Sequence, residues 1–127
     1  MNNVLGCHIL IEACDCDPGI LNNIEAVKET MINAALQAGA EVCNVAFHKF
    51  SPQGVSGVVV ISESHLSVHT WPEFGYAAID VFTCGDTVDP LTAVEHIREK
   101  FKARRALVSE VKRGIFDTHS ISKISPG

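Results

Sequence analysis

The 127-residue sequence lacks long hydrophobic runs and an excess of positive charge. A membrane-spanning helix needs about 20 consecutive apolar residues. The apolar runs here are far shorter, so we expect no membrane partner. Lysine and arginine number 10 against 15 acidic residues, which gives a formal net charge of −5. Because nucleic-acid binding needs a basic patch and none stands out, we expect no nucleic-acid partner either.

A secretory signal and a disulfide pattern are also missing. The first six residues have no basic segment before an apolar one, which predicts a protein without a signal peptide. The odd number of cysteines and their scattered spacing argue against a disulfide framework. No Cys-x-x-Cys redox motif occurs, because Cys14 and Cys16 are separated by only one residue. Together these features predict a cytoplasmic protein.

No repeat or linker divides the chain, and its hydrophobic content of 46% is enough for a core. Residues 1–127 are therefore expected to form one domain. The histidines are scattered as well. His65 and His69 are four apart and would share one face of a helix, but the surrounding sequence predicts a strand. We therefore expect no metal site.

The first third of the chain predicts a strand, a turn and a helix. Residues 5–13 are mostly apolar and indicate a strand, followed by a turn at 15–19. Residues 22–38 predict a helix with apolar residues at three- and four-residue spacing, and Gly39 is a natural stop. The apolar stripe of this helix comprises Ile24, Val27, Met31, Ala34 or Ala35, and Ala38.

The remainder predicts four strands, a helix and a last strand. Strands are expected at 42–50, at 58–61 with burial on both faces, at 67–71, and at 76–84. In the strand before Pro72, alternation directs Ser67, His69 and Trp71 to one side. Asp89 and Pro90 begin a helix, and 105–111 form a final strand. This order predicts an α+β two-layer sandwich with helices on one face of a mainly antiparallel sheet. After Asp117 no pattern is evident.

Reactive side chains gather between residues 57 and 85, inside apolar strands. An unpaired buried polar group costs about 1–3 kcal/mol, so these groups either satisfy one another or do chemistry. Glu63-Ser64-His65, with Ser56 and His69 nearby, permits a Ser/His hydrolase, but the Gly-x-Ser-x-Gly elbow is missing. A polar turn between two strands is the alternative, and the pattern alone favours it.

The segment Glu-Ser-His-Leu-Ser-Val-His-Thr-Trp-Pro-Glu (63–73) and the segment Gly-Tyr-Ala-Ala-Ile-Asp-Val-Phe-Thr-Cys-Gly (75–85) are far more specific than a Ser-His pair. They resemble the short prokaryotic S-adenosylmethionine decarboxylases, enzymes that make their own pyruvoyl cofactor. The resemblance extends through Phe-His-Lys-Phe (47–50) and Gly-Val-Ser-Gly (54–57), and covers roughly residues 5–116.

The resemblance implies that the chain cleaves itself between Glu63 and Ser64 into residues 1–63 and 64–127. The Ser64 hydroxyl attacks the carbonyl of Glu63, and elimination then leaves a pyruvoyl group at position 64. By the same resemblance His69 transfers protons during processing and Ser56 assists it. An imidazole titrates in the range this needs. From the sequence alone, Ser56 is equally well a turn serine.

The resemblance also implies how the substrate is bound and processed. The pyruvoyl ketone forms a Schiff base with S-adenosylmethionine, carbon dioxide leaves, and Cys84 protonates the product. The product is the aminopropyl donor for spermidine synthesis. Phe50, Trp71 and Glu73 match substrate-pocket positions, and a homodimer with sites near its interface is implied. Without the resemblance, Cys84 and the two aromatic residues would be assigned to the core and Glu73 to a solvated strand end.

Two other functions stay open on the sequence: a pyruvoyl-dependent arginine decarboxylase, and an unprocessed protein that binds an adenosyl ligand. An arginine pocket requires paired carboxylates for the guanidinium fork. Near the motif the acidic residues are Glu63, Glu73 and Asp80. Glu63 becomes a chain end and Asp80 lies within a strand, so only Glu73 is a clear candidate. This favours S-adenosylmethionine.

Overall fold

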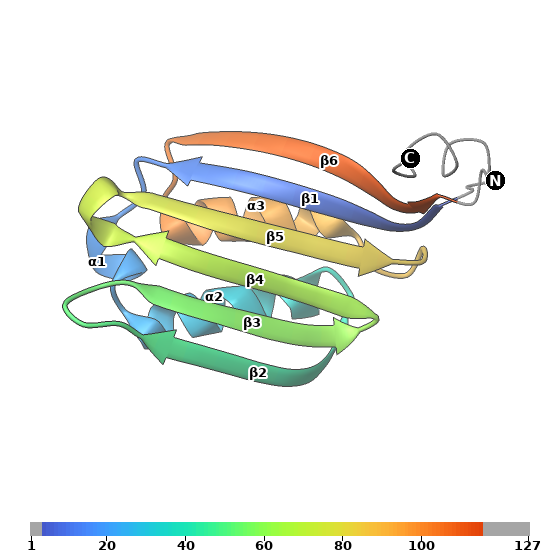
Figure 1. The fold of residues 1–127 in the computed structure, drawn as a ribbon, viewed down its shortest axis with the longest axis horizontal. Helices are drawn as coiled ribbons and strands as arrows, with labels where there is room; N and C mark the ends of the chain where they lie inside the picture. Colours follow the sequence, from blue (N-terminus) through green and yellow to red (C-terminus); the bar gives the residue numbers. More distant parts are fainter. Residues whose placement is uncertain (1–3, 116–127) are drawn as a thin grey trace, which may run out of the picture.

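The computed structural model describes residues 4–115, which form one antiparallel sheet and a layer of helices (Figure 1). The strands lie in the order β2-β3-β4-β5-β1-β6, and every pair is antiparallel. The elements in chain order are β1 (Val4–Cys14), α1 (Pro18–Leu21), α2 (Ile24–Gln37), β2 (Glu41–Lys49), β3 (Val55–Ser62), β4 (Ser64–Trp71), the 3-10 turn η1 (Pro72–Phe74), β5 (Tyr76–Cys84), α3 (Pro90–Phe101) and β6 (Arg105–Ile115).

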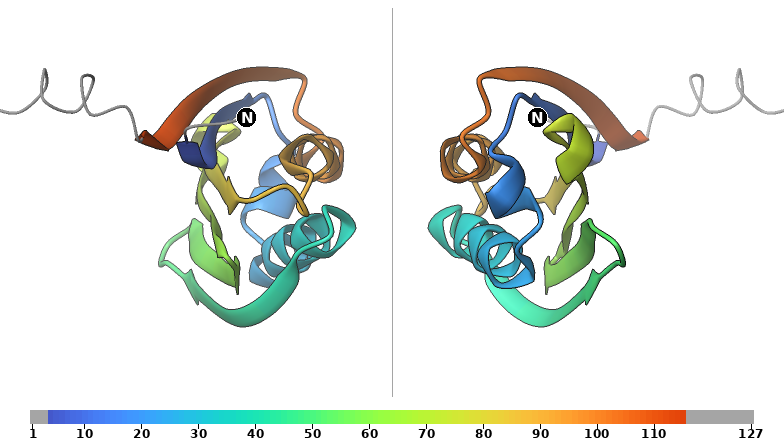
Figure 2. Two further views of the ribbon diagram at one scale, coloured as in Figure 1. Left: turned by 90° about the vertical axis from the view of Figure 1, so that its right-hand side faces the viewer. Right: turned by 90° about the vertical axis from the view of Figure 1, so that its left-hand side faces the viewer.

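The helices lie on one side of the sheet, as the two side views show (Figure 2). The core between the layers contains fully buried side chains from both, among them Phe101, Leu21, Met31, Leu66 and Val68. Each such residue stabilises the fold by about 1.5–3 kcal/mol relative to an exposed one. The predicted α+β two-layer sandwich is confirmed.

Helix ends follow from local chemistry. The Asn23 side chain accepts a hydrogen bond from the backbone N–H of Ala26 and begins α2. Gly39 has a φ of +92° just beyond the end of α2, a conformation that glycine adopts without strain. Asp89 caps α3 and Pro90 occupies its first turn. These starts and stops match the sequence expectations.

The other face of the sheet has no helix of residues 4–115 upon it (Figure 2). We call it the open face. The strand registers assign to it His8, Leu10, Glu12, Ser56, Val58, Val60, His65, Ser67, His69, Trp71, Tyr76, Asp80, Phe82, Cys84, Leu107, Ser109, Val111 and Arg113. The predicted alternation of Ser67, His69 and Trp71 is therefore correct.

The strands β3 and β4 begin three residues earlier than expected, at Val55 and Ser64, and β6 extends to Ile115 rather than ending at 111. Two further details also differ from the sequence expectation. The strand at 58–61 was expected to be buried on both faces, but β3 buries Val59 and Ile61 while Val60 is 40% exposed. The reason is that helices cover only one side. The turn expected at 15–19 instead leads into the short helix α1, begun by Asp17, which accepts from the N–H groups of Gly19 and Ile20. The expectation for the tail after Asp117 lies outside the described residues.

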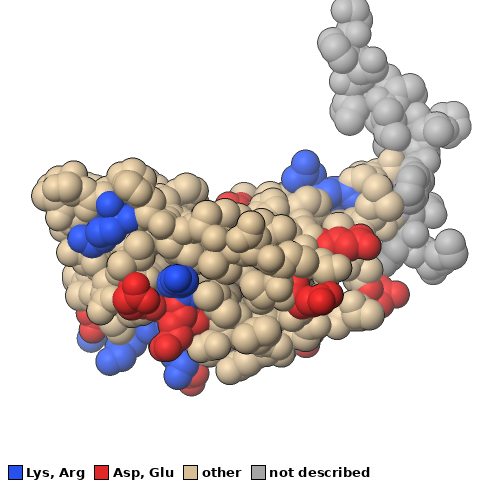
Figure 3. Space-filling view, turned by 90° about the horizontal axis from the view of Figure 1, so that it is seen from below, with Lys and Arg blue, Asp and Glu red and all other residues tan. Residues whose placement is uncertain are grey.

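Seen from the β2 edge, acidic and basic side chains are intermixed on the described surface, and neither sign of charge dominates it (Figure 3). Exposed ion pairs join Arg98 to Glu95 on α3 and Arg105 to Asp15. Such exposed pairs contribute about 0–1 kcal/mol each. Among residues 4–115, none of the helices is both long enough and apolar enough to cross a membrane.

Candidate active site

Ser64 lies at a strained position. Glu63 is the single residue between β3 and β4, and Ser64 is the first residue of β4, where it pairs with Ile61 across the hairpin. The φ of Ser64 is +129°, which is rare for any residue except glycine. Such a backbone costs about 1–3 kcal/mol and persists only where the surrounding structure holds it. The sheet imposes this conformation at the Glu63–Ser64 junction.

Cys84 lies close to this junction on the neighbouring strand. Ser64 pairs with Thr83 on β5, and Cys84 follows directly. Glu63 and Cys84 both line a hollow of about 760 Å³ at this end of the sheet. A Cβ added to Gly6 would stand 2.7 Å from the Phe82 ring and 3.2 Å from the Cys84 sulfur. Because Gly6 on β1 has no side chain, the Phe82 ring and the Cys84 thiol can pack against it without a clash.

A second thiol, that of Cys7, lines the same hollow. The Cys7 Sγ donates to Glu110 Oε2 at 2.9 Å. Burial, followed by the hydrogen bond to Glu110, raises the pKa of Cys7 to about 11. The Cys7 thiol is therefore already engaged by a carboxylate within the chain.

The other predicted residues gather at the opposite end of β4. Ser56 Oγ lies 2.8 Å from His69 Nδ1. Both residues line a groove of about 310 Å³ together with Phe50, Trp71 and Glu73. Phe50 is 46% exposed and Trp71 is 39% exposed. The sequence without the resemblance assigned both aromatic residues to the core. The structure instead places them at the surface.

One chain does not bring the two groups together. Ser64 and His69 are five positions apart on β4. At about 3.4 Å per residue the strand separates them by about 17 Å. Trp71 lies two residues farther along. The predicted site residues therefore form two clusters at opposite ends of the strand: the cleavage cluster (Glu63, Ser64 and Cys84) and the groove cluster (Phe50, Ser56, His69, Trp71 and Glu73).

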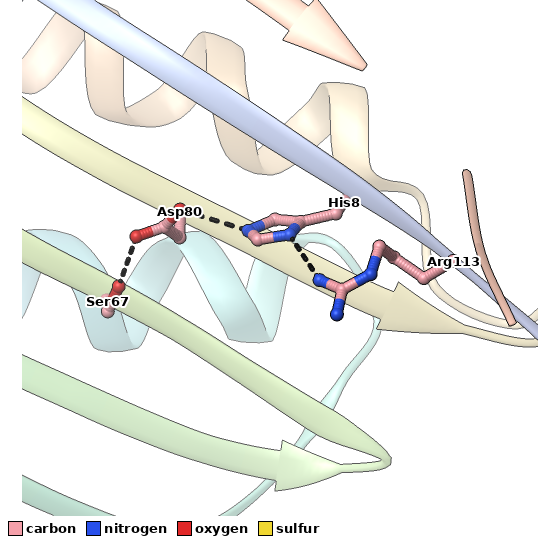
Figure 4. A network of polar contacts seen from close by, with 4 residues as sticks. All are labelled: His8, Ser67, Asp80 and Arg113. Atoms are coloured by element: carbon pink, nitrogen blue, oxygen red, sulfur yellow. Dashed lines mark hydrogen bonds and ion pairs between the residues drawn. The ribbon is translucent and has the colours of Figure 1, made fainter. Parts of the chain in front are cut away.

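A polar network that the sequence did not predict crosses the open face (Figure 4). His8 Nε2 lies 3.0 Å from Asp80 Oδ1, and the Ser67 hydroxyl donates to Asp80 Oδ2 at 2.8 Å. Arg113 donates to His8 Nδ1 at 3.0 Å. Arginine is only a donor, so Nδ1 accepts and His8 donates its Nε2 proton to Asp80. The network joins four adjacent strands, β6, β1, β5 and β4.

The network occupies the Asp80 carboxylate. Both of its oxygens have partners within the chain, so a guanidinium would have to share Asp80 with His8 and Ser67. Asp80 lies in the middle of β5, and its side chain points toward the open face. The sequence had left this direction undecided. Strand alternation indicates that His8 and Asp80 each point to one face of the sheet. Their contact, however, joins residues 72 positions apart in the sequence. No local pattern identifies such a pair.

The sequence profile of the S-adenosylmethionine decarboxylase family matches residues 7–114. Among curated proteins, the S-adenosylmethionine decarboxylase proenzyme of Acetivibrio thermocellus is 62% identical over 115 residues, covering 91% of this chain and 93% of the relative. The proenzyme of Pelotomaculum thermopropionicum is 60% identical over 121 residues, covering 95% and 96%. The crystal structure of the adenosylmethionine decarboxylase from Aquifex aeolicus superimposes with a TM-score of 0.85 at 33% identity, covering 91% of this chain and 95% of that one.

Proposed function

This chain belongs to the S-adenosylmethionine decarboxylase family, and we propose that it decarboxylates S-adenosylmethionine with a pyruvoyl group made from its own Ser64. The observation that carries the proposal is the backbone of Ser64, held at a φ of +129° directly after Glu63 and beside Cys84. The names of the relatives support it, because a proenzyme must be processed.

Processing uses only the chain and water. The Ser64 Oγ attacks the Glu63 carbonyl carbon, and the Glu63–Ser64 peptide becomes an ester with a free amine at residue 64. Loss of the α-proton of residue 64 then expels the Glu63 carboxylate and leaves dehydroalanine. Water replaces its nitrogen as ammonia, which yields the pyruvoyl group. Relief of the strained Ser64 backbone favours the first step.

Proton transfer in these steps falls to His69, which Ser56 orients through the 2.8 Å contact at Nδ1. Within one chain His69 is too distant from Ser64, so the proposal requires a second copy of the chain. In a two-fold symmetric dimer, if Ser64 meets the partner subunit's His69, the reciprocal contact forms as well. The axis must then pass near the middle of β4, close to Ser67.

The open face suits such a dimer. Its side chains include Leu10, Val60, Leu107 and Val111, each between 39% and 69% exposed. A sheet face that exposes several large apolar side chains and has no covering layer among the described residues is a candidate protein–protein interface. Two sheets stacked face to face lie about 10 Å apart, close enough for side chains of both to build a shared site. The dimer thus contains two equivalent sites, each joining one cleavage cluster to one groove cluster.

In catalysis the pyruvoyl ketone would supply an electrophile that captures the substrate amine and an electron sink for the departing carboxyl group. The residues that would surround it are Glu63, Thr83 and Cys84, which lie beside position 64. Cys84 delivers a proton to the α-carbon after carbon dioxide has left. Gly6 and Cys84 line the same hollow, and a side chain at Gly6 would crowd that thiol.

The groove cluster would bind the rest of the substrate. Phe50 and Trp71 present aromatic surface to the adenine and to the sulfonium charge, an attraction of about 0.5–2 kcal/mol for a cation on a ring. Glu73 accepts hydrogen bonds from the ribose hydroxyls. Among the described residues that line this groove, Glu73 is the one carboxylate, and Asp80 is engaged elsewhere by His8 and Ser67. One carboxylate among aromatic rings fits an adenosyl sulfonium better than a guanidinium.

The proposal is tested by mass and by turnover. A denaturing mass spectrum should show residues 1–63 and residues 64–127 carrying a pyruvoyl end, whereas Ser64→Ala should give one intact chain. An intact wild-type chain after long incubation would reject the processing step and favour the unprocessed adenosyl-binding protein. Carbon dioxide release should be faster from S-adenosylmethionine than from arginine at equal concentration. The reverse order would support the arginine decarboxylase instead.

A further inference from the structure

Trp71, in the groove cluster, is stacked on one side by a residue that does not line the groove. Trp71 at the end of β4 pairs with Tyr76 at the start of β5. Their ring centroids lie 5.3 Å apart with an interplanar angle of 27°. This offset stacking is a favourable arrangement for two aromatic rings. It covers one face of the indole and leaves the rest of the 39% exposed side chain toward the groove.

Tyr76 is in turn held from the next strand. Its hydroxyl donates a hydrogen bond to Glu12 Oε1 on β1. That hydrogen bond, with burial as the second cause, raises the pKa of Tyr76 to about 12. Glu12 pairs with Ala78, two residues after Tyr76 on β5, so the carboxylate reaches the phenol along the open face. A chain of contacts therefore runs from β1 through β5 to the indole on β4.

The geometry points to Tyr76 as a positioning residue: we propose that Tyr76, anchored by Glu12, fixes the plane of the Trp71 indole that receives the substrate. This inference rests on the proposed role of Trp71 in binding S-adenosylmethionine. An exposed indole at a strand end otherwise changes rotamer freely, and ordering it on binding weakens affinity. A ring that is already fixed avoids that loss. Tyr76 stacks on Trp71 and Glu12 bonds to Tyr76, whereas Ser64, His69 and Cys84 are the groups proposed to react, so we expect the effect on binding rather than on chemistry.

The chain provides its own probe, because it contains one tryptophan and one tyrosine. Intrinsic tryptophan fluorescence reports Trp71 alone, and spectrophotometric titration of the phenol reports Tyr76 alone. The test variants are Tyr76→Phe, which keeps the ring and removes the hydroxyl, and Glu12→Ala, which removes the acceptor. Glu12→Gln keeps a neutral acceptor. Glu95→Ala is the matched control, since Glu95 is an exposed carboxylate on α3 paired with Arg98.

In ligand-free protein, Tyr76→Phe and Glu12→Ala should lower the anisotropy of Trp71 and increase its quenching by acrylamide. Glu12→Gln should lie between them and the wild type. The KM for S-adenosylmethionine should rise about three- to tenfold while kcat stays within about twofold, the signature of lost ground-state and transition-state binding alike. The double variant should equal either single variant, because both remove one interaction. Glu95→Ala should match the wild type.

Unchanged Trp71 anisotropy and quenching in Tyr76→Phe would overturn the inference. So would altered fluorescence with an unchanged KM, because the indole plane would then be irrelevant to binding. Cleavage at the same bond in every variant, with fragment masses that differ only by the substitution, and equal sedimentation coefficients ensure that neither processing nor dimerisation accounts for the changes. A wild-type protein that releases no carbon dioxide would reject the proposed function, and with it the substrate role assigned to Tyr76. The ligand-free fluorescence would still report whether Tyr76 orders the indole.

Discussion

Ser64 and His69 lie on the same strand, about 17 Å apart along it. The serine belongs to the strained junction at one end of β4, and the imidazole is bonded to Ser56 near the other end. A proton can pass between two groups only at hydrogen-bond distance or through one water. The proposed proton transfer between them therefore requires two copies of the chain.

Mixing two inactive chains should restore processing. Neither Ser64→Ala nor His69→Ala should cleave by itself. When they are co-expressed with different affinity tags, the hetero-dimer contains one site that joins the intact Ser64 of one chain to the intact His69 of the other. The His69→Ala chain should then be cleaved and the Ser64→Ala chain should stay whole, as mass spectrometry of the doubly purified dimer would show. An uncleaved mixture would place both residues in a site built by a single chain.

Cys84→Ala should separate processing from turnover. In the proposed mechanism the thiol acts only after processing, so fragments of wild-type length are expected. Turnover should fall by about 10²- to 10⁴-fold, the range for a lost general acid. Misplaced protonation should also convert the pyruvoyl end to alanine, which mass spectrometry detects. Cys43→Ala, an exposed cysteine on β2, should behave as wild type. Normal turnover and lifetime in Cys84→Ala would remove this residue from the mechanism.

A carbonyl reagent should inactivate the protein while a chelator leaves it active. Hydroxylamine condenses with ketones, and fragment 64–127 of the wild type should gain the corresponding mass. Ser64→Ala should gain none. No group of three or more His, Cys, Asp and Glu side chains between residues 4 and 115 is arranged to hold a metal ion. Loss of activity with a chelator, recovered on adding zinc, would contradict the pyruvoyl proposal.

Stability should fall in mild acid because of His96. This residue is buried on α3, and its Nε2 lacks a hydrogen-bond partner among the described residues. Burial, with a smaller effect of Lys100, lowers its pKa, while Glu99 opposes the shift. The unfolded chain then binds a proton more readily, so stability is full above a pH of about 6.5 and decreases below it. Urea unfolding at several pH values measures this loss, and His96→Leu should remove it. If the free energy of unfolding falls equally with pH in both proteins, the assignment to His96 is wrong.

Gly57→Ala should destabilise the fold by about 1–3 kcal/mol, the usual cost of overpacking. A Cβ at this position would lie 2.0 Å from Cδ2 of Phe47, the residue paired with Gly57 across β2 and β3. Replacing Phe47 by leucine in the same chain should recover part of the loss, because the ring is the obstacle. The free energy of unfolding from urea titration measures both. A single variant as stable as the wild type would show that the ring moves aside freely.

Much of the fold was predictable because its signals are local. The α2 stripe, the Asp89 cap and the alternation from Ser67 to Trp71 each depend on neighbouring residues. The exposure of Val60 was not predictable, since four successive apolar residues look the same whether a second layer covers them or not. Whether Val60 is buried or exposed depends on which face of the sheet the helices cover. That arrangement is set by contacts between segments distant in the sequence.

The candidate site shows the same division. Its residue types were found through a motif, and the structure places Ser56 beside His69 as expected. The separation of Ser64 from His69 could also be counted from the sequence once β4 was known to be one uninterrupted strand. The sequence predicted β4 only from Ser67, so that distance was hidden. The His8–Asp80 pair depends on β1 entering the sheet beside β5, a pairing that no short-range pattern encodes.

The strand order has a consequence for a chain cut at the proposed Glu63–Ser64 bond. Residues before the Glu63–Ser64 bond supply β1, β2 and β3, and those after it supply β4, β5 and β6. In the sheet, β1 is inserted between β5 and β6, and β4 lies against β3. The two fragments are therefore interlocked and cannot separate without opening three strand interfaces. The uncut Ser64→Ala chain should regain its subunit fold at a rate independent of concentration. The processed protein becomes two molecules once denatured, so its recovery depends on their encounter and slows on dilution.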